Sequence, residues 1–566
     1  MSRTLAAQFT PARSSRPRPA RLFAVLLCAL TGLPGIAGAA DEEPEFAPHR
    51  CDALADVEIA EDAIIGEILI DNRNIFDLRD PRENSGFYRL ANRLHVPTRP
   101  SVILAQLLFE SGDVYSKRLL MESERILRAN GYIYDARICP VRYEGSVVDI
   151  AVVTRDVWTL TPDIGFTREG GENESRIGFE EANVLGTGIS IGAVRNVEVD
   201  RSSTSFLYSD PHVAGSWVQL GFIITESSDG EALGLDVERP FYAMDARNSG
   251  GFSWLDENRI DPLYDRGDVV EEFRHELELT RVFFGLSEGL KDGWVHRWTF
   301  GMGREIDEFS FAPSDTPATV LPEDRKLIYP FIGFQVLEDK FEETMNLDQI
   351  GRTEDFFLGT GFSMELGFAG EAFGSDRNAM LFNTSAQYGF EPSLDRLWLL
   401  DGTLSGRYED GSVADALFSG RVRHYRRQDE HNVTFYTLQA DVAEDLDRET
   451  QLLLGGDSGL RGYPLRYQSG NRRMLATVEQ RLFTDYYPWR LFRLGFAAFV
   501  DVGRTWGENA VGTDNLGVLK DVGIGMRLGS TRSGSGNVIH VDLAFPLDGE
   551  DDISNVQLLF QTKATF

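Results

Sequence analysis

The sequence predicts a mainly β protein in which a small α+β domain precedes an antiparallel transmembrane β-barrel. Apolar and polar residues alternate with period two through most of residues 157–566, as in strands with one apolar and one polar face. The chain begins with an export signal, and no later stretch reaches about eighteen consecutive apolar residues, the length of a membrane helix. An exported chain of this kind spans a membrane only as a closed barrel, in which all backbone groups are paired.

Residues 1–39 have the pattern of a secretory signal peptide. Five arginines precede an apolar run from Leu22 to Leu33, and Ala37-Gly38-Ala39 supplies the small residues of a cleavage site. The apolar run is too short for a stable membrane helix. Cys28 does not fit a lipoprotein signal, because the large Leu27 stands before it. We therefore expect cleavage after Ala39.

The composition restricts the classes of function. The formal net charge is −33, and residues 1–39 hold five arginines and no acidic residue, so the mature chain is more acidic still. Binding to nucleic acid requires a basic surface, and this composition excludes it. Disorder is not expected either, because 42% of the residues are hydrophobic and 11% are aromatic.

Residues 40–63 are an acidic lead-in, and residues 64–156 have the pattern of a compact mixed domain. We expect a strand at Ile64–Ile70, a helix from Ser116 to Gly131 and two further strands after it. Ser116 carries a hydroxyl of the kind that caps a helix N-terminus.

Two cysteines remain after the signal. Cys51 lies in the lead-in, and Cys139 lies in a predicted strand of the mixed domain. An oxidising periplasm permits a disulfide between them, which would tie the start of the mature chain to the domain. Two unpaired thiols are the alternative.

Residues 157–566 are expected to form the barrel. Its first strand lies near Trp158–Phe166, and Pro162 in that strand has no backbone donor for the hydrogen-bond ladder. The last strand ends the chain, and its alternate residues are expected to face outward: Val556, Leu558, Phe560, Thr562, Ala564 and Phe566. We therefore expect the barrel to close at a seam that includes Trp158, Pro162, Phe560 and Phe566.

A loop of unusual composition interrupts the alternation. Residues 455–464 hold four glycines, one proline and a single arginine, Arg461, which together are incompatible with a regular element. Further along the chain, Phe492–Gly503 alternates cleanly, with Phe496 and Val500 on the apolar face and Asp501 on the polar face.

Two short motifs in this region resemble those of a known family. Leu460-Arg461-Gly462-Tyr463, followed by Phe499-x-Asp501-x-Gly503, is similar to the paired motifs of the BamA/TamA-type outer-membrane assembly-factor superfamily, which combines POTRA domains with a surface-antigen barrel. The resemblance implies a barrel of about sixteen strands with the motif loop folded back inside it. It also implies an ion pair between Arg461 and Asp501, and the fork of a guanidinium suits a carboxylate. A glycine-rich surface loop with a solvated arginine is the alternative.

The resemblance extends to both ends of the mature chain. Residues 64–156 are similar to a single POTRA domain, and the aromatic end at Phe566 resembles the C-terminal recognition signal of outer-membrane barrels. The implied location is the outer membrane, with the N-terminal domain in the periplasm. The implied partners are outer-membrane lipid and unfolded or exported client polypeptides, with periplasmic chaperones or accessory lipoproteins as further candidates.

Charged residues on the polar faces of predicted strands are expected to form a network inside the barrel. Glu479 and Arg481 lie on one such strand, and Asp521 and Arg527 lie on another. Paired charges satisfy each other in a partly wet interior and offer partners to the motif loop. Alternatively, these residues only line a wet channel.

No catalytic, metal or cofactor site is predicted. Gly456-Asp457-Ser458-Gly459 is a tetrad found around the nucleophile of chymotrypsin-like proteases, but no upstream histidine stands in a recognisable motif. The sequence also has no calcium-loop pattern and no H-E-x-x-H motif. We therefore expect a protein that is not an enzyme and needs no cofactor.

The family resemblance implies that the protein inserts or assembles client proteins into the outer membrane through a laterally opening barrel. Two alternatives remain: a secretion transporter of the two-partner type, which passes a client through the lumen, and a structural barrel without transport. The single POTRA-like module is fewer than the general assembly factors carry, which suggests a narrower range of clients.

Overall fold

The structure is a computed structural model that describes residues 51, 54, 57–511, 517–533, 538–549, 553–563 and 566. The predicted signal peptide, most of the acidic lead-in and Ala564 lie outside the described residues, as do the side chains of residues 161–164. Among the residues described, no helix is both long enough and apolar enough to cross a membrane.

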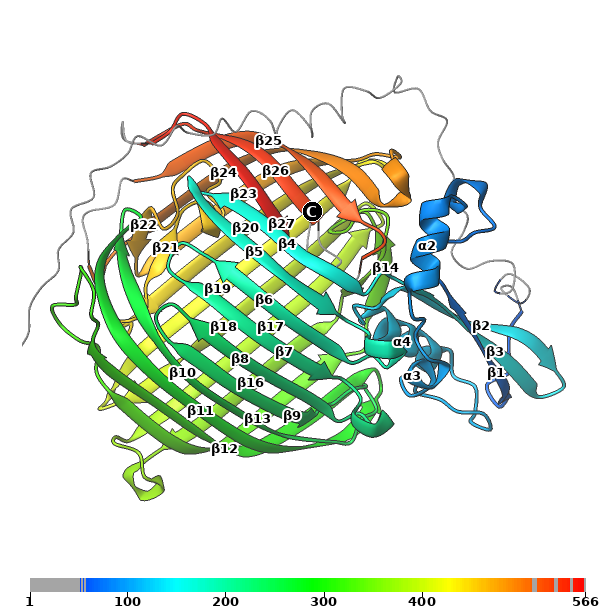
Figure 1. Cartoon of the computed structure of the whole chain (residues 1–566). Helices are drawn as coiled ribbons and strands as arrows, with labels where there is room; N and C mark the ends of the chain where they lie inside the picture. Colours follow the sequence, from blue (N-terminus) through cyan, green and yellow to red (C-terminus); the bar gives the residue numbers. More distant parts are fainter. Residues whose placement is uncertain are drawn as a thin grey trace, which may run out of the picture. The chain divides into compact units, whose positions relative to one another are not determined.

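The N-terminal domain is a three-stranded sheet covered by helices (Figure 1). The sheet order is β1-β3-β2, in which β1 runs parallel to β3 and β2 pairs with β3 in the antiparallel sense. Ile103 and Leu127 on the helices are fully buried in one core with Ile65 and Ile150 of the sheet. The elements are β1 (Ile64–Arg73), η2 (Pro81–Glu83), α2 (Gly86–Leu94), α3 (Pro100–Leu104), α4 (Lys117–Arg128), β2 (Ile133–Glu144) and β3 (Val147–Asp156).

Helix α4 shows how local sequence sets an element. Ser116 precedes its first residue, and the Ser116 side chain accepts a hydrogen bond from the backbone N–H of Leu119 at 3.5 Å. Leu120 and Leu127, two helical turns apart, are both buried in the core of the domain. The helix therefore begins where its cap is and faces the sheet with its apolar side.

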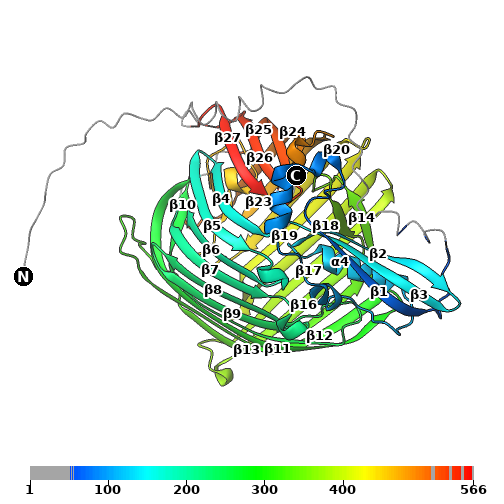
Figure 2. The same cartoon turned by 45° about the vertical axis from the view of Figure 1, so that its right-hand side comes forward.

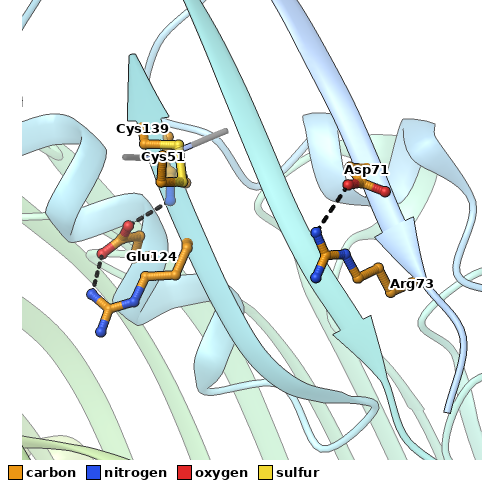
Figure 3. The surroundings of a disulfide bond; sticks show 7 residues. Cys51, Asp71, Arg73, Glu124 and Cys139 are labelled. Atoms are coloured by element: carbon orange, nitrogen blue, oxygen red, sulfur yellow. Dashed lines mark hydrogen bonds and ion pairs between the residues drawn. A yellow bond between two sulfur atoms is a disulfide. The ribbon is translucent and has the colours of Figure 1, made fainter. Parts of the chain in front are cut away.

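A disulfide joins Cys51 to Cys139 on β2, across 88 residues of chain (Figure 3). Cys139 is buried against Ala151 and Val153 of the neighbouring strand β3. Beside the disulfide, the carboxylate of Glu124 on α4 accepts a hydrogen bond from the backbone N–H of Ile138. The bridge ties the first described residue of the chain to the sheet.

The rest of the chain is dominated by a closed antiparallel barrel of twenty strands (Figures 1 and 2). Neighbours along the chain are neighbours in the barrel, and the barrel closes between β27 and β4. The strands are β4 (Leu160–Glu169), β5 (Glu172–Glu181), β6 (Ser190–Val197), β7 (Ser202–Asp210), β8 (Gln219–Ser227), β9 (Glu231–Arg239), β10 (Asn248–Asp265), β11 (Asp268–Lys291), β12 (Trp294–Phe311), β13 (Arg325–Glu338), β16 (Thr360–Ala369), β17 (Ala379–Ser393), β18 (Arg396–Glu409), β19 (Ser412–Arg427), β20 (Asn432–Glu444), β23 (Arg472–Phe483), β24 (Phe492–Trp506), β25 (Leu519–Ser530), β26 (Val538–Pro546) and β27 (Gln557–Lys563).

The strand count corrects the expected sixteen. The expected count was carried from the family resemblance, and alternation alone also allowed fourteen or eighteen. The first six strands, from Leu160 to Arg239, have only eight to ten residues each and are joined by short turns. Alternation fixes which residues share a face, but it does not fix where one strand ends and the next begins. The short early strands leave room for additional strands in the same length of chain.

The two faces of the barrel wall differ in polarity. The outward face carries large apolar side chains with high exposure, such as Ile177 at 62%, Phe284 at 51% and Ile524 at 58%. On the inward face of the last strands, Asp501 and Arg527 have no exposed surface. The alternation read from the sequence therefore separates an apolar exterior from a polar lumen, as in membrane barrels.

Two small hairpins depart from the wall. The first, formed by β14 (Phe341–Met345) and β15 (Thr353–Phe357), lies between β13 and β16 in the chain. The second, formed by β21 (Leu452–Leu454) and β22 (Gln468–Gly470), lies between β20 and β23 and frames the glycine-rich motif loop. Each hairpin holds a loop that contacts β23: Leu347 accepts a hydrogen bond from Arg481, and Arg461 donates to Glu479.

Candidate functional site

The motif loop folds back on itself inside the barrel. Its backbone closes through a hydrogen bond from the N–H of Gly456 to the carbonyl of Pro464 at 2.9 Å. Gly455 is required at this closure, because a Cβ there would lie 2.3 Å from the carbonyl oxygen of Pro464. Gly459 has φ +110°, a conformation that glycine adopts without strain. These glycines allow the tight path that carries Arg461 into the lumen.

Arg461 makes a two-bond contact with Asp501 on β24. The Nε atom donates to Oδ2 at 2.7 Å, and Nη2 donates to Oδ1 at 3.0 Å. The guanidinium also lies over the ring of Phe499, 3.3 Å from its centroid. Arg461 is only 8% exposed and Asp501 is fully buried, so the predicted partners form a desolvated, fork-like ion pair.

The other motif residues fix the loop around this pair. The backbone N–H of Gly462 donates to Oδ2 of Asp521 at 3.0 Å, and a Cβ at Gly462 would lie 2.7 Å from the Cβ of Asp521. Tyr463 is fully buried, and its hydroxyl lies 2.8 Å from the carbonyl oxygen of Lys520. Leu460 packs in the same apolar cluster as Tyr463. The structure thus brings all four residues of this motif against the inner wall.

Glu479 on β23 links the motif pair to the predicted lumen network. It accepts hydrogen bonds from Arg461 at 3.0 Å, from Arg481 at 3.0 Å and from Arg527 at 3.5 Å. Arg527 also donates to Asp542 on β26. Asp542 was not singled out from the sequence, although its inward position in the alternation of β26 is a signal that would have found it. The residues form one connected network.

Phe566, the last residue of the chain, is seated inside the barrel. Its side chain is 4% exposed, and its ring lies 4.6 Å from that of Phe483. Gly495 makes room for it, because a Cβ at Gly495 would lie 2.7 Å from the Phe566 ring. The outward orientation expected for Phe566 is therefore corrected: β27 ends at Lys563, so the strand alternation does not govern the last residue.

A loop of the first hairpin holds Phe566 in place. The backbone N–H of Phe566 donates to the carbonyl of Asp348 at 2.6 Å, and Nη2 of Arg481 donates to the carbonyl of Phe566 at 3.3 Å. The Asp348 carboxylate in turn accepts a bond from the hydroxyl of Tyr425 at 2.9 Å. No pattern in the sequence predicts this contact, since Asp348 and Phe566 lie far apart in the chain and share no motif.

The same hairpin is bound to the N-terminal domain. Arg128 of α4 donates to Asp355 at 2.8 Å and to Glu343 at 2.7 Å, and the hydroxyl of Tyr134 donates to the carbonyl of Gly351 at 2.8 Å. The hairpin therefore contacts the domain with its strands and loop, and its loop holds the C-terminal residue.

Among the described residues, the seam between β27 and β4 has the fewest register pairs of any junction of the barrel. Among the described residues, Phe560 and Arg168 are its one register pair, although β27 and β4 lie side by side in both views (Figures 1 and 2). The neighbouring junctions of β26 with β27 and of β4 with β5 have seven and ten pairs. On the outer face, the rings of Phe560 and Phe166 lie 6.3 Å apart.

Of the two other residues assigned to the seam from the sequence, Trp158 lies outside the first strand and Pro162 lies within it. Trp158 is not in the first strand, which begins at Leu160; its backbone N–H donates to the carbonyl of Arg532 at 2.7 Å, and its side chain packs near Phe76 of the N-terminal domain. The backbone of Pro162 is in register with Phe179 of β5, and the Pro162 side chain lies outside the described residues. Trp158 is thus a contact of the domain with the barrel wall.

The protease-like tetrad belongs to the turn that closes the motif loop. The hydroxyl of Ser458, in the protease-like tetrad, is bonded to the backbone of Gly455. In the part of the chain that the structure describes, no group of three or more His, Cys, Asp or Glu residues is placed to hold a metal ion.

Fold and site together define a closed antiparallel β-barrel whose lumen holds a folded-back loop anchored by a buried arginine. No protein-family model and no curated protein matches the chain. Among solved structures, it is similar to BamA from Haemophilus ducreyi lacking POTRA domains 1–3, with 12% identity and a TM-score of 0.38 over 88% of this chain and 85% of that chain. It is also similar to CdiB from Acinetobacter baumannii, with 11% identity, a TM-score of 0.41 and coverages of 89% and 74%. For CdiB from Escherichia coli the identity is 12%, the TM-score is 0.37 and both coverages are 94%.

Proposed function

We propose that this chain is an outer-membrane β-barrel protein that inserts or assembles client polypeptides, with a POTRA-type periplasmic domain and no catalytic chemistry. The observation that carries the proposal is the seam, where β27 and β4 share one register pair among the described residues. Other neighbouring strands of the barrel share at least seven. Because a sheet opens where the fewest ladder bonds hold it, the seam is the place where a client strand enters.

The outer face of the barrel supports a location in the membrane. Phe206 and Ile224, register partners on β7 and β8, are each 43% exposed on the outer face, where other large apolar side chains are exposed as well. Aromatic rings gather near one end of the wall, where the ring of Trp298 lies 4.7 Å from that of Phe334 and Trp398 stacks on His424 at 3.9 Å. β12 and β18 run in the same direction, so both groups lie near the same end, as in an interfacial aromatic girdle.

The energetics of strand pairing favour opening at the seam. A backbone hydrogen bond contributes about 0.5–1.5 kcal/mol net, so parting a junction with one register pair costs much less than parting one with seven or more. In lipid, each edge group left without a partner costs several kcal/mol more, and an incoming client strand removes that cost by pairing with the open edge. The open seam is therefore a template for a new strand.

The motif loop braces the wall on one side of the seam. Its contacts reach four successive strands through Glu479 on β23, Asp501 on β24, Asp521 on β25 and Asp542 on β26, which lies 3.8 Å from Arg461. The loop also reaches the other side of the seam, where Gly456 lies against Gly170 in the β4–β5 turn and Arg466 pairs with Asp200 after β6. The β27–β4 junction is therefore the weakest by its register pairs, and the contacts of the loop across it must part when it opens.

The proposal is tested by locking the seam with a disulfide. Arg168→Cys and Phe560→Cys are substituted together, because register partners on antiparallel strands lie close enough for a disulfide. A control lock joins Phe206→Cys to Ile224→Cys, also register partners on the outer face. The folding of an unfolded outer-membrane barrel protein is then timed in liposomes. The seam lock should abolish the acceleration and the control lock should not; full acceleration with a locked seam would overturn the proposal.

Passage of a client through the lumen is a second candidate function. A cavity of about 510 Å³ on the inner wall of β5–β11 favours it, because a transporter needs a surface inside the barrel that contacts its cargo. The same locked variants separate the two functions. A secretion transporter retains client export with the seam locked, whereas an insertase of the kind proposed here does not.

A further inference from the structure

The inner wall of β7–β11 carries a row of apolar side chains where a membrane barrel is expected to be polar. Register places Leu207 opposite Ile223, and continues through Gly234 to Leu255 and Leu279. These residues alternate with the outward-facing Phe206, Ile224 and Trp254 on the same strands, so they face the lumen. Leu207 and Ile223 thus place apolar side chains on the inner faces of β7 and β8, opposite the apolar residues of their outer faces.

This row lines a cavity rather than a packed core. The cavity has a volume of about 510 Å³, within the range of sites that bind organic ligands. Leu207 keeps 38% of its surface exposed, so the row offers apolar surface inside the lumen. Gly192 and Gly221 line the same cavity, and nothing lies within 3.5 Å of the position that a Cβ would take at either glycine. The wall is therefore hollowed by glycines and lined with aliphatic side chains.

The charged residues around the cavity are mainly acidic. Glu180, Asp236 and one cation, Arg176, line it, and Glu238 follows on the same face of β9. None of these three carboxylates forms an ion pair among the described residues, whereas Arg281 nearby is paired with Glu365 at 2.6 Å. Unneutralised carboxylates next to an aliphatic surface attract a ligand that combines apolar and cationic groups, and they repel phosphate and fatty-acid headgroups.

We infer that this cavity is a binding site for an unfolded polypeptide segment in which leucine-like side chains stand beside lysine or arginine. The inference deepens the proposed function, since it names a recognition site and a sequence preference for the client. Aliphatic side chains of the segment would cover Leu207, Ile223 and Leu255, and its cations would neutralise Glu180 and Asp236. A lipid occupant fits the row but not the carboxylates.

The first test places a photo-crosslinking residue on one strand at two adjacent positions. Ile223 faces the lumen and Ile224 faces outward, so the two variants differ only in the face that carries the probe. The full chain is held in lipid nanodiscs and exposed to a fluorescent peptide of alternating leucine and lysine. The expected result is crosslinking from position 223 alone. Equal labelling from both positions, or labelling from 224 alone, would overturn the inference.

Peptide composition then separates the chemical requirements. A leucine–glutamate peptide and a serine–lysine peptide of the same length should each bind at least about tenfold more weakly. The carboxylates of the cavity repel the glutamates of the first peptide, and the second peptide has no aliphatic side chains to bury. Oleate added as a competitor should leave crosslinking unchanged. Displacement of the peptide by oleate would assign the cavity to lipid and overturn the proposal.

Two substitutions complete the test. Asp236→Asn should weaken binding of the leucine–lysine peptide several-fold and leave the weak binding of the leucine–glutamate peptide unchanged or improved. Ile223→Thr should weaken the leucine–lysine peptide about tenfold, with Ile224→Thr as the matched control that does not. If all variants bind equally, the site is refuted. Peptide binding is read without any client-folding assay, so its failure is distinct from failure of the seam to open.

Discussion

Removing the side chain of Arg461 is the sharpest test of the motif loop. Arg461→Ala leaves the carboxylates of Asp501 and Glu479 buried without the cation that donates to them at 2.7 and 3.0 Å. Breaking one partner of a buried ion pair costs about 3–5 kcal/mol, and the lost contact with the ring of Phe499 adds about 1 kcal/mol. We expect the free energy of barrel unfolding, measured by urea titration in lipid vesicles, to fall by about 4–6 kcal/mol.

The same loop provides a matched control. Arg466 forms a two-bond ion pair with Asp200 at 2.7 and 2.8 Å, but 18% and 23% of their side-chain surfaces stay exposed. Because solvent screens such a pair, Arg466→Ala should cost only about 0–1 kcal/mol. Arg461→Lys keeps the charge but not the planar fork, so its cost should fall between the two. Equal losses for Arg461→Ala and Arg466→Ala would refute the argument that burial makes the Arg461 pair decisive.

Three further predictions follow from the described contacts. Phe566→Ala should lower the free energy of barrel unfolding by about 3 kcal/mol, because the ring is buried against Phe483. Phe206→Ala on the outer face should lower it much less. The unfolding of both variants is followed by heat-modifiable electrophoretic mobility, and equal shifts would contradict the inward position of Phe566. Replacing Cys51 and Cys139 with serine should destabilise the N-terminal domain by about 2–4 kcal/mol in thermal unfolding, and an unchanged melting temperature would show that the bridge does not constrain the unfolded chain. Burial raises the pKa of Glu124 from 4.5 in the unfolded chain to about 7 in the folded domain, so the folded domain binds more protons between these two values. The stability that Glu124 contributes should be complete below pH 4.5 and should be lost as the pH rises through about 7. Glu124→Gln should flatten this pH dependence.

Much of this protein is determined by local pattern. Period-two alternation separates an apolar exterior from a polar lumen, and it places Asp501 and Glu479 on the inner face before any partner is known. The glycines around Arg461 identify a loop with a single strong donor, and the resemblance of its motif supplied Asp501 as the partner. These features are accessible because each depends on residues a few positions apart, or on a motif that names both partners.

The tertiary structure decided what depends on the ends and edges of strands. Three findings follow from where strands begin and end. The barrel has twenty strands rather than sixteen, Phe566 points inward and is bonded to Asp348, and Trp158 lies outside the first strand. The apolar row from Leu207 to Leu279 exists only because register aligns residues on successive strands. The sequence by itself determined the two faces of each strand, because side-chain direction is local. The strand count, the position of the seam and the cavity could be determined only from the folded barrel. Hydrogen-bond register joins segments that no short-range pattern in the sequence connects.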